Sequence, residues 1–195
     1  METIISLCIG LALSAAAGFR LLVPFLALSV AAIFGHFPVS PDLQWVGTYP
    51  AMEAFAIAVL AETLLYYIPW LDHLMDMVAL PASMIAGTLI TASFATHLDP
   101  FLQWSLAIIA GGGAAAAVKG LTGASRLTST LTTGGIGNFI VTTLELVGAI
   151  VVSVLAIALP KLAIVLIPML VIVVIGQGAR HWWKHRQSLQ PSTGN

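Results

Sequence analysis

Long apolar segments, separated by short polar or proline-containing breaks, dominate the pattern along this chain. The apolar segments cover residues 4–35, 51–69, 77–96, 102–118, 137–159 and 161–178. A helix needs about 20 mostly apolar residues to cross the hydrocarbon core of a bilayer. The pattern therefore predicts an all-α polytopic membrane protein with about six transmembrane helices.

The first segment is too long for one straight span. As a single helix, residues 4–35 would extend about 48 Å, whereas the hydrocarbon core is about 30 Å thick. Its middle, Ala15–Arg20, is a run of small residues that ends in a charge, and Gly111–Lys119 has the same character. We expect broken or re-entrant helices at both places. Close helix packing is the other common use of such small residues.

The composition excludes several classes of protein. Of the 195 residues, 59% are hydrophobic and only 8% are charged, with a net charge of −1. This excludes a water-soluble monomer and a basic nucleic-acid-binding protein, and the single cysteine, Cys8, excludes a disulfide scaffold. The first residues lack the positive region of a cleavable signal peptide, so we expect the first segment to stay as an anchor. One transmembrane domain over residues 1–186 and a polar tail over 187–195 are expected.

An internal repeat is indicated by matched charges. Placing Ser6–Arg20 on Ser105–Lys119 aligns their final basic residues, and further along Glu62 meets Glu145. Alanine and leucine identities are weak support in such a composition, but intramembrane charges are rare. We therefore predict a duplication.

The predicted repeats cover residues 4–98 and 102–178. With three spans in each half, the halves would be inverted relative to one another, as in many secondary transporters. With re-entrant hairpins at 4–35 and 102–134, each half would have two spans and the halves would run parallel. The sequence leaves both arrangements open, with the inverted one preferred.

Ionisable groups inside apolar segments cost about 2.5–3.5 kcal/mol each on insertion scales, so they are functional candidates by default. Glu62 lies nine residues after Glu53, about 13 Å along a straight helix, and could carry a proton near the midplane. A half-helix N-terminus beside a basic residue could bind an anion. The primary candidates for substrate or ion binding, or for coupling, are Arg20, Glu62, Lys119, Glu145 and Asn138.

A purely structural role for the same charges is equally supported. Glu62 could pair with Arg20, and Glu145 with Lys119, because these four charges sum to zero. In that arrangement the charges would only hold the helices together.

Secondary candidates follow the second and fourth segments. Asp72 and Asp76 share a helix face, with His73 between them, but two carboxylates and one histidine are an incomplete ligand set. A solvated loop is the favoured interpretation of these three residues. Arg126 lies in a hydroxyl-rich stretch that could line an aqueous cavity or form an ordinary interfacial helix. No catalytic motif, metal site or cofactor motif is present in the sequence, so we expect no enzyme activity, no metal and no cofactor.

Basic residues suggest the orientation and the partners. Arg180, Lys184 and Arg186 follow the last apolar segment, so we expect a cytoplasmic C-terminus near anionic lipid. Six spans would place the N-terminus on the same side, with Lys119 and Arg126 in or beside a cytoplasmic loop. The lipid bilayer is the main expected partner. A homodimer is plausible because a chain of this size encloses little volume, and no nucleic acid is expected.

Three strings resemble a known family. They are Ala-Gly-Phe-Arg20-Leu-Leu-Val-Pro-Phe, Ala61–Asp72 and Ala86–Ser93. They are similar to a bacterial family of small multi-pass membrane proteins, domain of unknown function forty-one twenty-six, over residues 5 to about 178. The resemblance implies a bacterial inner-membrane protein and brings no established activity.

The leading hypothesis is a small transporter or channel, proton-coupled and handling a small, anionic solute. The alternative is a membrane scaffold that organises lipids or partners without transport, with structural ion pairs.

Overall fold

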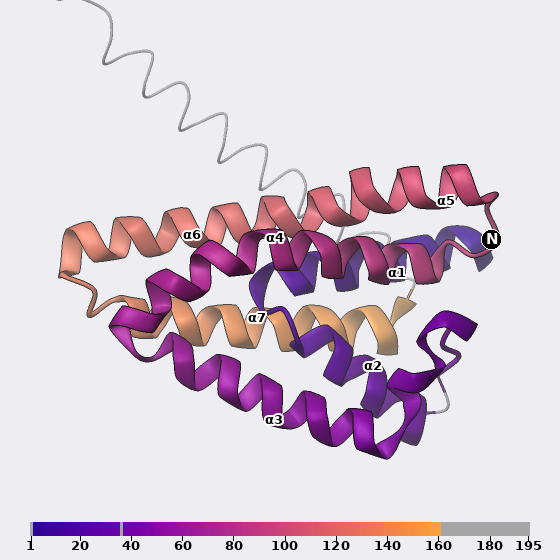
Figure 1. The fold of residues 1–195 in the computed structure, drawn as a ribbon, viewed down its shortest axis with the longest axis horizontal. Helices are drawn as coiled ribbons and strands as arrows, with labels where there is room; N and C mark the ends of the chain where they lie inside the picture. Colours follow the sequence, from indigo (N-terminus) through magenta and orange to yellow (C-terminus); the bar gives the residue numbers. More distant parts are fainter. Residues whose placement is uncertain (1, 36, 161–195) are drawn as a thin grey trace, which may run out of the picture.

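The structure is a computed structural model that describes residues 2–35 and 37–160, apart from the side chains of Glu2, Asp42, Pro69, Trp70 and His73. Every regular element in this part of the chain is a helix (Figure 1). The elements are α1 (Glu2–Phe19), α2 (Val23–Phe34), the 3₁₀ helix η1 (Pro41–Gly47), α3 (Tyr49–Tyr66), α4 (Pro69–Phe94), α5 (Pro100–Leu106), the π-helix η2 (Ala107–Gly112), α6 (Gly113–Thr133) and α7 (Asn138–Ala158).

Four helical stretches are long and apolar enough to cross a membrane. They are Tyr49–Tyr66, Leu74–Phe94, Pro100–Thr133 and Asn138–Ala158. They agree with four of the six apolar segments in the sequence. The segment 161–178, the basic cluster that follows it and the polar tail lie outside the described residues.

The first apolar segment is broken, as expected. α1 ends at Phe19 and α2 begins at Val23. Figure 1 shows the chain turning back at this point, so α2 returns toward the end of the molecule where α1 began. Pro24 lies in the first turn of α2, where its missing N–H costs nothing. α1 and α2 therefore form a re-entrant hairpin whose tip is Arg20–Leu22.

The second predicted break, at Gly111–Lys119, is wrong. α5, η2 and α6 form one continuous helical stretch, and the only irregularity in it is the π-helical turn at Ala107–Gly112. The glycines there serve close packing instead. A Cβ on Gly111 would lie 2.3 Å from Thr91 Oγ1 and 2.5 Å from the carbonyl oxygen of Gly87, so only glycine allows α4 to approach so closely.

The directions of the helices bear on the predicted repeat. Short turns make α3, α4, α5–α6 and α7 alternate in direction, so α3 and α7 run opposite to each other (Figure 1). α1 runs in the same direction as α6. Two repeats related by one symmetry rotation must show the same relative direction in every matched pair of segments. Here α1 runs parallel to its match in α5–α6, whereas α3 runs opposite to its match α7 (Figure 1). The six-span repeat is therefore not confirmed by the described residues.

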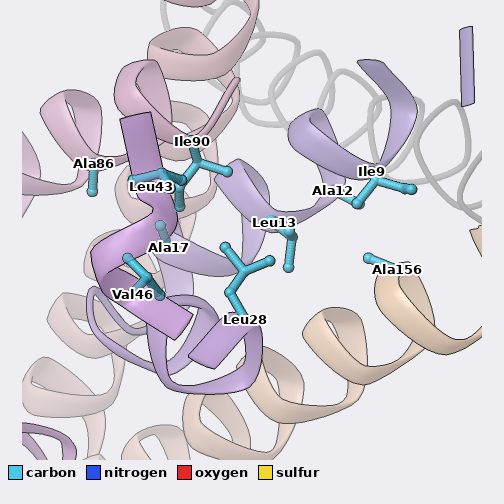
Figure 2. Packing of buried hydrophobic residues seen from close by; sticks show 10 residues of the cluster. All are labelled: Ile9, Ala12, Leu13, Ala17, Leu28, Leu43, Val46, Ala86, Ile90 and Ala156. Carbon is cyan, nitrogen blue, oxygen red and sulfur yellow. The ribbon is translucent and has the colours of Figure 1, made fainter. Parts of the chain in front are cut away.

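α1 forms the centre of the bundle and packs against α4, α6 and α7. The buried core combines apolar side chains of α1 with others from α2, η1, α4 and α7 (Figure 2). Its members are Ile9, Ala12, Leu13, Ala17, Leu28, Leu43, Val46, Ala86, Ile90 and Ala156. Many large apolar side chains point outward, such as Ile57, Met77 and Ile109, each more than half exposed. A chain that is apolar both inside and outside suits a hydrocarbon environment.

Candidate functional site

Seven ionisable side chains gather where the tip of the α1–α2 hairpin meets α3, α4, α6 and α7. Three are basic and four are acidic. They are Arg20, Lys119, Arg126, Glu62, Asp72, Asp76 and Glu145. We call this group the charge cluster. It brings together every charged candidate from the sequence except His73, whose side chain lies outside the description.

Arg126 connects three helices within the charge cluster. Its Nε donates a hydrogen bond of 3.0 Å to Glu145 Oε1, and Nη2 donates to the other oxygen of the same carboxylate. Its Nη1 donates to Asp72 Oδ1. This forked arrangement suits the planar guanidinium group. Arg126 is buried inside α6, so its predicted position in or beside a loop is wrong.

Lys119 is the other basic residue of α6 and lies about two helical turns before Arg126. Its Nζ lies 2.8 Å from Asp76 Oδ1, an ion pair without hydrogen-bond geometry, and donates a hydrogen bond of 2.9 Å to Tyr66 Oη. Lys119 is buried, whereas the side chain of Asp76 is 26% exposed. The predicted pair of Lys119 with Glu145 is therefore wrong, because Arg126 takes that carboxylate.

Arg20 is fully buried at the tip of the hairpin and only partly satisfied. Its Nη2 donates to the backbone carbonyl oxygen of Thr142 at 3.3 Å and lies 3.8 Å from Glu145 Oε2. Among the described residues, its Nε and Nη1 have no hydrogen-bond partner, nor has the buried hydroxyl of Thr142. Unpaired buried donors are costly, so a guanidinium with two of them is unusual.

Glu62 is held by the backbone of the hairpin tip. Its Oε1 accepts a hydrogen bond from the N–H of Leu21 at 3.0 Å, and its Oε2 accepts one from Leu22 at 3.3 Å. The break between α1 and α2 leaves these two donors without helical partners, because the helix ladder stops there. No ion pair of Glu62 is found among the described residues, so the predicted pair with Arg20 is wrong.

Tyr66 lies at the centre of the three basic groups. The guanidinium carbons of Arg20 and Arg126 lie 4.1 and 4.4 Å from the centroid of its ring, and Lys119 Nζ lies 4.9 Å from it. A ring face attracts cations, so Tyr66 reduces the mutual repulsion of three buried positive charges. An aromatic residue at the end of an apolar segment is usually an interfacial anchor, so the role of Tyr66 could not be predicted from the sequence.

A cavity of about 230 Å³ opens beside the cluster, at the end of the bundle where the α3–α4 and α6–α7 turns meet. Asp72 belongs to both the cavity wall and the charge cluster, and Tyr66, which contacts the three basic members of the cluster, also lines the cavity. Asn138, a primary candidate, lines the cavity and donates to Asp72 Oδ2 at 3.2 Å. Thr130 completes this polar side, and Gly134 and Gly135, both at positive φ, form the turn beside it.

The solvated-loop interpretation of Asp72 and Asp76 is also corrected. Asp72 is buried at 2% exposure and bonded to Arg126, and Asp76 pairs with Lys119. Both lie on α4, one turn apart, and face α6. In the described part of the chain, no group of three or more His, Cys, Asp or Glu residues could hold a metal ion.

One of the four carboxylates in the charge cluster has no basic partner among the described residues. Three basic groups neutralise three acids, namely Asp72, Asp76 and Glu145. The fourth acid, Glu62, forms no ion pair among the described residues and accepts hydrogen bonds from two backbone N–H groups. With all seven groups ionised, the cluster carries one excess negative charge. Protonation of Glu62 would make it neutral.

Comparisons with known proteins place the chain in a family. Neither a search of curated proteins nor a search of solved structures finds a match. A family model described as "Domain of unknown function (DUF4126)" matches residues 7–178, a stretch that includes the whole charge cluster. This chain therefore belongs to the DUF4126 family.

Proposed function

We propose that this protein is a small membrane transporter or channel that moves protons, with Glu62 as the proton carrier. The observation that carries the proposal is the arrangement of the seven charges. Three acids are paired with three cations, and Glu62 remains outside every ion pair of the described residues. A carboxylate whose protonation neutralises a buried cluster is suited to take up and release a proton.

The fold supplies two features that a pathway needs. The re-entrant hairpin brings its irregular backbone and Arg20 into the interior, where such backbone is tolerated only beside protein or a water-filled space. On the other side, the cavity reaches Asp72, a member of the charge cluster, and Tyr66, which lies against its three basic groups. Glu62 lies one helical turn before Tyr66 on α3, so the cavity ends close to the proposed proton carrier.

The expected location is the bacterial inner membrane. The charge pattern beyond residue 178 favours a cytoplasmic C-terminus beside anionic lipid. A homodimer remains part of the proposal, because a single chain of this size encloses little volume.

The experiment is a proton-flux measurement on purified protein in liposomes. A pH-sensitive dye is trapped inside, a pH gradient is imposed, and valinomycin with potassium allows charge to move. The outside anion is chloride, nitrate or pyruvate in turn. We expect Glu62→Gln to lose the flux of the wild type in whichever medium supports it. The matched control is Glu53→Gln, because Glu53 lies on the same helix and is exposed. Equal flux for Glu62→Gln and wild type in every medium would refute the proposal.

The alternative is a scaffold in which the charges only cross-link helices. The bonds from Arg126 on α6 to Asp72 on α4 and Glu145 on α7 favour it, because they tie three helices together. A scaffold would show no flux in any variant. It would lose stability when Arg126 is replaced, as the transporter also would, so flux decides between the two.

A further inference from the structure

The tip of the re-entrant hairpin is built as a binding site for a carboxylate. Two successive backbone N–H groups, those of Leu21 and Leu22, point at one carboxylate and bond both of its oxygens. They precede α2, a helix of 12 residues, whose positive N-terminal end favours negative charge. Successive N–H groups of this kind form an anion-binding concavity.

Arg20 provides a second, independent indication of a ligand. It directly precedes Leu21 and is only 1% exposed. In the described part of the chain its Nε and Nη1 lack hydrogen-bond partners. Among the described residues, the buried Thr142 hydroxyl, on the residue whose carbonyl binds Arg20, also has no hydrogen-bond partner. Burying a polar group without a hydrogen-bond partner is unfavourable, so these donors are better explained by an occupant that is bound during part of a cycle.

We propose that this site, formed by the N–H groups of Leu21 and Leu22 and by Arg20, binds a small monocarboxylate anion that competes with the Glu62 side chain. This rests on the proton-carrying role proposed for Glu62. The group that fills the site in the structure is itself a carboxylate, so the geometry selects a ligand of the same shape and charge. The ionised Glu62 acts as a tethered occupant of the site.

Proton and anion are then coupled by charge. A proton that binds to a Glu62 oxygen removes its negative charge and one of its acceptor sites, and the side chain leaves the two N–H groups. An anion that takes its place restores the same total charge, because one proton and one anion enter together. The charge cluster keeps one excess negative charge in both states. Uptake is therefore one proton with each anion, and it is electroneutral.

Tyr66 separates this site from the cavity. Its ring lines the cavity and also lies against the Arg20 guanidinium, 4.1 Å from the ring centroid. The Tyr66 ring therefore lies between the cavity and the Arg20 guanidinium. A cavity of about 230 Å³ has room for a small monocarboxylate such as formate or pyruvate.

The test is the binding of ¹³C-labelled formate to the full chain in lipid nanodiscs, followed by NMR line broadening at mildly acidic and mildly alkaline pH. We expect the formate Kd of the wild type to rise by at least about fivefold at alkaline pH, the lower end of ordinary coupling between two ligands. Glu62→Gln imitates the protonated side chain, so its Kd should be low and independent of pH. Glu53→Gln is the matched control and should behave as the wild type.

Arg20→Lys, made in the Glu62→Gln background, keeps the charge but removes the two unpartnered donors. It should weaken formate binding by about tenfold, the equivalent of one lost charge-assisted hydrogen bond. Circular dichroism and gel filtration verify the fold of each variant. If Glu62→Gln does not fold, the wild type alone decides, because formate binding that is independent of pH would overturn the competition.

Two further results would overturn the inference. One is a folded Glu62→Gln protein that binds no formate at either pH, and the other is one whose Kd depends on pH as in the wild type. The outcome is separable from that of the proposed function. Loss of proton flux in Glu62→Gln without any formate binding would leave the proton carrier intact and remove the anion site. Formate binding by a protein without proton flux would support the anion site and refute the proton-carrying function.

Discussion

Glu62 Oε1 accepts a hydrogen bond of 3.0 Å from the backbone N–H of Leu21, so a carboxylate on α3 closes the tip of the hairpin between α1 and α2. The bond joins the one acid of the cluster that has no ion pair in the described residues to the irregular backbone of the hairpin tip in the interior of the bundle. Stability, proton uptake and ligand access all depend on this contact.

Replacing Glu62 by Gln should loosen the hairpin tip. An amide group can accept from only one of the two N–H groups with its oxygen, and its own NH₂ faces the other. One buried donor left unpaired costs about 1–3 kcal/mol. Thermal unfolding in detergent should show this loss, and hydrogen exchange at Leu21 and Leu22 should become faster. Unchanged exchange at both amides would show that Glu62 does not hold the tip.

Arg126→Gln should be the most destabilising charge change. It removes the partner of both Asp72 and Glu145, which are buried, and a broken buried ion pair costs about 3–5 kcal/mol. Adding Asp72→Asn should recover part of the loss, because one stranded charge disappears. The free energy of unfolding in a double-mutant cycle measures this coupling.

The control for Arg126 is its exposed neighbour. Ser125→Ala removes a hydroxyl that bonds only within its own helix, and should change stability by less than about 0.5 kcal/mol. If Asp72→Asn lowers stability equally with and without Arg126, the two residues are not coupled.

Removing the Tyr66 hydroxyl should destabilise the protein less than removing the whole ring. Tyr66→Phe removes the oxygen that accepts from Lys119, at about 1 kcal/mol. Tyr66→Leu also removes the ring face that attracts three cations, which adds about 1–2 kcal/mol or more. Thermal unfolding measures the loss of stability in each variant and shows which loss is larger. The control is Tyr67→Phe, since Tyr67 bonds only the exposed Thr143 hydroxyl among the described side chains, and a larger loss there would contradict the central role of Tyr66.

Gly18 tests the close packing of α1. A Cβ at this position would lie 2.4 Å from the carbonyl oxygen of Ala115, so Gly18→Ala must separate α1 from α6, at about 1–3 kcal/mol. Gly120→Ala, on α6 with open space around it, should instead stabilise the helix by about 0.5–1 kcal/mol. The same unfolding measurement distinguishes them. Equal effects of the two substitutions would mean that α1 and α6 are not in contact at Gly18.

The cavity predicts which positions water can reach. In a Cys8→Ala background, a single cysteine at Thr130 should react with a membrane-impermeant thiol reagent from one side of the membrane, because Thr130 lines the cavity. A cysteine at Val118, which is 2% exposed on the same helix, should be protected. Labelling at 118 in the folded protein, or protection at 130, would show that the cavity is not open to water.

The sequence was sufficient for much of the fold, because the length of an apolar segment is a local property. It predicted the helices now described as α3, α4, α5–α6 and α7, and the break beside Arg20. It failed at Gly111, where a glycine run looks the same whether it breaks a helix or lets two helices touch. The contact with Thr91 and Gly87 decides this, and it depends on packing between segments distant in sequence.

The members of the charge cluster could be predicted, but their pairing could not. Charges are rare in apolar segments, so each one stood out, and Asn138 did so as well. Which acid faces which base depends on the rotation of each helix, and the zero sum of four charges suggested the wrong pairs for Glu62 and Glu145. Asp72 looked solvated because Pro69 and Trp70 precede it, yet the α3–α4 turn places it against Arg126.

The most direct test of the central claim is infrared difference spectroscopy on the reconstituted protein during acidification. A protonated carboxylic acid in a buried site gives a C=O stretching band that an ionised carboxylate lacks. If Glu62 is the proton carrier, the band appears in the wild type and in Glu53→Gln and is absent in Glu62→Gln. A band that persists unchanged in folded Glu62→Gln would place the proton on another acid of the cluster and contradict this account.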